Sequence, residues 1–211
     1  MMKKWLVGLL FMAGCSMNND YANTEPNPMT VELPEISTEV QTMYDLLSEG
    51  FAGVDVTIPK QFLTNEHTFY VGYQHYINGE LVERRDEIMG VGLGTSSSKD
   101  EQTLKMSIRM AEHEEGDHKI AVVNDHGASI AQFDIKRISG SSSSTSMPSV
   151  PTMATIGEPF IYHIDVRHND TTFNAFAHVL SIESLRDLAE DYDDVLALTF
   201  IVKHQPQVEK M

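Results

Sequence analysis

The side chains of this sequence that could do chemistry are mainly its 9 histidines and 31 carboxylates. They are densest around Gly116, and imidazole and carboxylate groups are common ligands of divalent metals. The spacing matches neither a His-Glu-x-x-His pair on a helix nor an Asp-rich calcium loop. Neighbouring side chains on extended backbone also point to opposite faces. We therefore expect a solvated hairpin tip, in which the candidate metal ligands are His113, Glu115, Asp117 and His118.

Motifs for nucleophilic or phosphate chemistry are missing from the sequence. It contains no Gly-x-Ser-x-Gly elbow, and its one glycine-rich run, residues 90–94, leads into a serine run without the apolar pattern of a helix. His163 and His168 are five positions apart on an expected strand and so fall on opposite faces. The sequence therefore predicts no catalytic residue and no cofactor.

The only cysteine, Cys15, follows a short apolar run that begins after Lys3 and Lys4. A positive start, an apolar stretch and small residues before a cleavage point are the parts of a secretory signal. The run is too short to cross a hydrocarbon core as a helix. Met12-Ala13-Gly14-Cys15 resembles a bacterial lipoprotein signal, although Met12 stands where leucine is usual. The resemblance implies that Cys15 receives a thioether-linked diacylglycerol and becomes the first residue of the mature protein.

The chain is strongly acidic. Removal of residues 1–14 takes away two lysines and no acid, which leaves 13 basic and 31 acidic residues and a formal charge of −18. Nucleic-acid binding is therefore not expected, because phosphate recognition needs a basic surface. Acidic side chains would also be repelled by anionic lipid, so contact with the membrane is expected through the N-terminal lipid alone.

These observations favour a membrane-anchored, exported lipoprotein of the cell envelope that faces the extracytoplasmic side. Its partners are the membrane, through the lipid, and an unidentified protein or small-molecule ligand. We expect a non-enzymatic binding or accessory domain. The alternative is a lipid-anchored hydrolase or metal-dependent enzyme that uses histidines and carboxylates scattered through the sequence.

Most of the chain alternates as strands do. A polar, Pro- and Asn-rich tether over residues 15–30 precedes a single β-rich domain over residues 31–211. Asn78-Gly79 predicts a hairpin between strands 67–77 and 81–89. The aromatic residues of strand 67–77 occupy both faces, which indicates either a ligand surface or a strand that is covered on both sides. Further strands are expected at residues 54–58 (a sheet edge), 103–110, 119–123, 129–138, 160–166, 173–180 and 195–203, the last in the centre of a sheet.

Two segments have the apolar spacing of helices, residues 35–49 and residues 181–192, the second with Ser181 as its N-cap. The expected fold class is therefore mainly β with two helices: an antiparallel β-sandwich, or an open sheet covered by the two helices. Residues 139–155 are rich in Ser and Pro and have no apolar period, so we expect a loop within the domain. The other interpretation makes this segment a linker between two domains.

Overall fold

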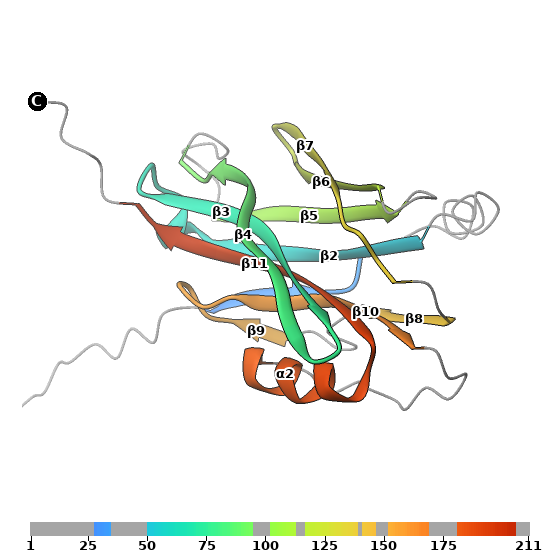
Figure 1. Cartoon of the computed structure of the whole chain (residues 1–211). Helices are drawn as coiled ribbons and strands as arrows, with labels where there is room; N and C mark the ends of the chain where they lie inside the picture. Colours follow the sequence, from blue (N-terminus) through green and yellow to red (C-terminus); the bar gives the residue numbers. More distant parts are fainter. Residues whose placement is uncertain are drawn as a thin grey trace, which may run out of the picture.

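The computed structural model describes residues 28–34, 50–94, 102–112, 117–138, 141–146, 152–168 and 181–205. These residues form two antiparallel sheets that lie against each other (Figure 1). The six-stranded sheet has the order β7-β6-β5-β2-β1-β9, and the five-stranded sheet has the order β4-β3-β11-β10-β8.

The six-stranded sheet is made of β1 (Met29–Glu32), β2 (Gly50–Pro59), β5 (Thr103–Glu112), β6 (Asp117–Asn124), β7 (Gly127–Asp134) and β9 (Thr152–Ala154). The five-stranded sheet is made of β3 (His67–Ile77), β4 (Glu80–Gly92), β8 (Ser141–Ser146), β10 (Phe160–His168) and β11 (Asp194–His204). A short 3-10 helix, η1 (Lys60–Phe62), follows β2, and the α-helix α2 (Ile182–Asp191) precedes β11.

The main core lies between the two sheets. Alternate residues of β2 and β5, such as Val56 and Ile108, meet alternate residues of β3 and β11, such as Tyr73 and Phe200. All four side chains are fully buried. Because the period of a strand is two, the residues between them point to the opposite face of each sheet.

The outer face of the five-stranded sheet has its own small core beneath α2. Leu185 and Ala189 of the helix pack with Tyr76, Ile164 and Val195 of the sheet. Ser181 caps the helix as expected: its hydroxyl accepts from the Ser184 N–H, and the Ser184 hydroxyl accepts from the Ser181 N–H. Strand β3 therefore packs against the other sheet on its inner face and, at Tyr76, against α2 on its outer face.

The expected fold class is wrong in its helices. The part of the chain that the structure describes contains one α-helix, α2, which covers one face of one sheet, and the two sheets cover each other's inner faces. The helix expected over residues 35–49 and the strand expected over residues 173–180 lie outside the described residues.

Several strands differ from the expectation. Residues 54–58 belong to β2, which lies inside its sheet between β5 and β1 rather than at an edge. The expected loop over residues 139–155 contains β8 and β9. Both are edge strands, which need only one backbone neighbour, so an apolar period is not required of them.

Two sequence signals are confirmed. Asn78 and Gly79 both have positive φ, 50° and 79°, as a type I′ turn requires, and they join β3 to β4. Residues 195–203 lie in β11, the central strand of its sheet. Within the described residues, no helix is long and apolar enough to span a membrane.

Candidate functional site: a buried ionic network between the sheets

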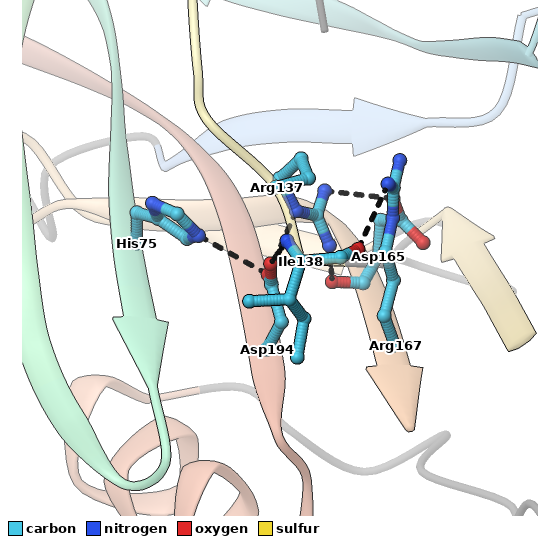
Figure 2. A network of polar contacts seen from close by, with 6 residues as sticks. All are labelled: His75, Arg137, Ile138, Asp165, Arg167 and Asp194. Carbon is cyan, nitrogen blue, oxygen red and sulfur yellow. Dashed lines mark hydrogen bonds and ion pairs between the residues drawn. The ribbon is translucent and has the colours of Figure 1, made fainter. Parts of the chain in front are cut away.

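The densest group of interacting polar side chains lies inside the protein, at one end of the space between the sheets (Figure 2). At its centre is Arg137, in the segment that leaves β7 and crosses from the six-stranded sheet toward the five-stranded one. Its guanidinium donates from Nε to Asp194 Oδ1 at 2.7 Å and from Nη1 to Asp165 Oδ2 at 2.8 Å. Arg137 therefore joins two carboxylates on neighbouring strands, β11 and β10.

Local backbone structure explains why these side chains meet. Asp165 pairs with Leu196, and Arg167 pairs with Asp194, in the register of β10 with β11. Leu196 belongs to the main core, so side chains at alternate positions, Asp194 and Asp165 included, face the other sheet. Residues after β7 continue the alternation, since Phe133, Ile135 and Arg137 all point inward.

Two further groups complete the network. His75 Nε2, on β3, donates to Asp194 Oδ1 at 3.1 Å, and the Ile138 N–H donates to Asp194 Oδ2 at 2.8 Å. Arg167 Nη1 donates to the Ile138 carbonyl at 3.3 Å. Ile138 is therefore bonded through its N–H to Asp194 and through its carbonyl to Arg167 (Figure 2). Asp194 thus accepts three hydrogen bonds, one from β3 and two from adjacent residues of the crossing segment.

The electrostatics follow from this geometry. Burial alone would raise the pKa of Asp194, but the hydrogen bond from His75, the Arg137 charge and the Ile138 N–H together hold that pKa below its ordinary value. Asp194 is therefore ionised at neutral pH. Its side chain is 0% exposed and that of Arg137 is 1% exposed, so water does not screen their attraction.

His163 lies on the same inward-facing set of β10 and is also buried. Burial lowers the pKa of this imidazole to about 3, and the positive charge of Arg137 and the neighbouring His118 act in the same direction. His163 is therefore neutral at any ordinary pH. His118, on β6, is fully buried and stacks on Phe133 with ring centroids 5.4 Å apart.

A histidine bonded to a carboxylate is the arrangement that orients a general base in acyl-transfer enzymes. Here His75 and Asp194 are closed off from solvent, with 3% and 0% of their surfaces exposed. Their polar atoms are directed at each other and at Arg137, so the arrangement joins strands and does not face a substrate. Breaking such a buried pair typically costs about 3–5 kcal/mol.

The candidate metal ligands do not form a site in the described residues. His113 and Glu115 lie outside them, and Asp117 begins β6. His118 points into the core rather than toward a solvated tip, because its backbone lies inside β6 and pairs with Phe133. No group of three or more His, Cys, Asp or Glu side chains in the described ranges is placed to hold a metal ion. Cys15 also lies outside the described residues.

Sequence reasoning missed Arg137, Asp165 and Asp194 as partners. Arg137 falls within the strand expected over residues 129–138, whereas β7 ends at Asp134. The alternating pattern gave no signal for Asp165, because it lies between the apolar positions Ile164 and Val166, at a position that the pattern leaves polar. His163 and His168 lie on one strand as expected, and they do not converge: His168 bonds to Asp193, 3.0 Å away.

A second charged cluster lies on the outer face of the six-stranded sheet. Asp55 of β2 is 2.8 Å from Arg109 Nη2, 2.9 Å from Lys105 Nζ and accepts from the Ser107 hydroxyl, all on β5. Burial would raise the pKa of Asp55, but these three neighbours lower it. Lys105 Nζ is also 3.7 Å from a carboxylate oxygen of Glu32 on β1, so two cations meet two carboxylates within the sheet.

Comparison with family models identifies the domain. The model of the YgaN domain matches residues 30–201, which run from β1 into β11 and include both sheets and the whole network. The chain belongs to the YgaN domain family. The YgaN match leaves residues 1–29, with Cys15, outside it. Neither the curated proteins nor the solved structures contain a match to the chain.

Proposed function

We propose that this protein is an exported lipoprotein, acylated at Cys15, whose YgaN domain acts as a non-enzymatic binding or accessory domain of the cell envelope. The observation that carries the proposal is the order of parts at the N-terminus. Lys3 and Lys4, an apolar run and Ala13-Gly14-Cys15 are followed by a polar segment and then by the first strand at Met29.

The position of β1 supports a tether. Met29 is fully buried, so the domain begins there, and Cys15 lies upstream of it. The intervening residues could span at most about 50 Å if extended. With the formal charge of −18 on the mature chain repelled by anionic lipid, an acyl anchor at a distance holds the domain near the membrane without requiring contact with it.

The buried network supports the non-enzymatic part. The residue types that enzymes use as acids, bases and electrophiles, here Asp194, His75 and Arg137, are bonded to one another inside the sandwich. Their polar groups bond to one another and so join the two layers. Recognition would then use the surface, where the strands present polar and a few apolar side chains.

Acylation can be tested in cells fed a labelled fatty acid. The full chain should carry the label and pellet with membranes, and Cys15→Ser should lose the label and either leave an uncleaved precursor or release the protein. The matched control is the double variant Cys15→Ser/Ser16→Cys, which keeps a thiol but moves it by one residue. Labelling of Cys15→Ser, or equal labelling of the double variant, would reject acylation at Cys15.

A further inference from the structure

Strand β7 lies at one edge of the six-stranded sheet. Among the described strands it pairs with β6 alone. The register is continuous from the pair of Asp117 with Asp134 to the pair of Asn124 with Gly127. Figure 1 shows the β6–β7 hairpin at the rim of the molecule. Ile130, at the middle of β7, has 72% of its surface exposed, the most of any large apolar side chain in the described residues.

The other sheet edges have features that discourage pairing with another chain. Strand β4 carries six charged residues between Glu80 and Glu87, and its register with β3 shifts twice, as at bulges. Strand β9 has only 3 residues, and β8 has 6, all Ser or Thr. Charges, bulges and short length are the usual protections of sheet edges.

Strand β7 lacks these protections. From Gly127 to Phe133 its sequence, GASIAQF, contains no charged residue and no proline, and its register with β6 is regular. In an antiparallel ladder, alternate residues direct their N–H and C=O groups toward the same neighbour. About half of the backbone groups of β7 therefore face away from β6, where another strand could bind them.

We propose that β7 pairs antiparallel with β7 of a second copy of this chain, so that the two six-stranded sheets become one sheet across a two-fold axis. The charge distribution favours a second copy here. The chain carries a net charge of −16, which makes copies repel each other over most surfaces, whereas this edge is uncharged over seven consecutive residues.

The edge is also complementary to itself. A two-fold axis at Ile130 places Ile130 opposite Ile130 of the second copy and Ala128 opposite Gln132. The same register brings His126, in the β6–β7 turn, opposite Asp134, so that an imidazole meets the only carboxylate of β7. The exposed Ile130 side chains then cover each other on the outer face, beside Val123.

Disulfide crosslinking can test this pairing. Ile130→Cys is made in the full chain carrying Cys15→Ser, so that the new thiol is the only one, and the protein is oxidised in detergent. Residues directly opposite each other lie within the Cα separation that a disulfide allows. The controls are Val82→Cys on β4 and Met153→Cys on β9, which start from side chains that are 51% and 63% exposed.

We expect at least ten times more disulfide-linked dimer from Ile130→Cys than from either control. Equal yields from all three, no dimer, or crosslinking of Ile130→Cys only to a different protein would overturn the proposal. A second measurement is the mass of the full chain in detergent by light scattering. Ile130→Lys should convert a dimer to a folded monomer with an unchanged far-UV circular dichroism spectrum, and Met153→Lys should remain a dimer; a monomeric parent chain would contradict the pairing.

Discussion

Arg137 Nε lies 2.7 Å from Asp194 Oδ1, although the two residues are 57 positions apart and Asp194 belongs to the five-stranded sheet while Arg137 follows β7 of the six-stranded sheet. The bond therefore ties the connection between the layers to the central strand β11. Because both side chains are buried, this single contact links the stability of one sheet to that of the other.

Loss of the Arg137 charge should be strongly destabilising. Arg137→Met keeps much of the side-chain volume but leaves Asp165 and Asp194 buried without their guanidinium, which should lower the free energy of unfolding by about 3–5 kcal/mol. Arg84→Met, which removes an exposed pair with Asp86, should cost less than about 1 kcal/mol. Urea denaturation of both variants provides the comparison, and similar losses would show that the network contributes no more than a surface pair.

His163 should make the protein less stable in mild acid. Its pKa is about 3 in the folded protein and 6.5 ordinarily, so the unfolded chain takes up the proton first as the pH falls. Stability should decrease from about pH 6.5 toward pH 3, by up to about 1.4 kcal/mol per pH unit. His163→Leu should flatten this dependence between pH 6.5 and 4.5, above the range in which Asp194 and Asp55 titrate. His126→Leu, at an exposed turn, is the control, and an equal flattening in both variants would contradict the assignment.

Adjacent residues of β11 should differ in importance because they face opposite sides. Phe200 is fully buried and stacks on Phe69 and Phe160, at centroid distances of 5.3 Å and 5.1 Å. Phe200→Ala should therefore lower the free energy of unfolding by about 3–5 kcal/mol. Ile201 is only partly buried on the outer face, so Ile201→Ala should cost less than half as much. Thermal and urea unfolding of the two variants test whether the two side chains lie on opposite faces of β11. Equal losses of stability would contradict that arrangement.

Cleavage between β8 and β9 should leave two pieces that remain together. After a protease site is introduced within residues 147–151, the C-terminal piece still supplies β9, β10 and β11, and β11 pairs with β3 of the N-terminal piece over eleven positions. The cut protein should elute as one complex until denaturant is added. Expression of residues 156–211 alone as a soluble fragment that unfolds cooperatively would instead indicate two domains.

The sequence was informative where one local rule decides the structure. Asn78-Gly79 specifies a turn with positive φ, Ser181 satisfies the first N–H groups of α2, and the apolar run after Asp194 requires burial on both faces. Position within a sheet depends on which strands pair, and this is not a local property. Residues 54–58 have the pattern of an edge strand because the run ends at Pro59. In the structure, however, β1 pairs with one side of this strand and β5 with the other.

The site was harder to predict than the strands for the same reason. Arg137, Asp165 and Asp194 carry no motif, since their partners come from β3, β10, β11 and a crossing segment whose meeting depends on the whole topology. The sequence places His118 at a solvated hairpin tip because its neighbours in the sequence are charged. Its position inside β6 gives it an inward direction that those neighbours do not share.

The place of β11 in its sheet has a consequence for the order in which the protein can assemble. This strand comes near the end of the chain, and both β3 and β10 pair with it. During synthesis the five-stranded sheet stays divided until Asp194–His204 has left the ribosome, and the Asp194 contacts of Arg137 and His75 cannot form before then. The five-stranded sheet can therefore be completed only after β11 has been made, whereas the pairing of β2, β5, β6 and β7 in the six-stranded sheet does not require it.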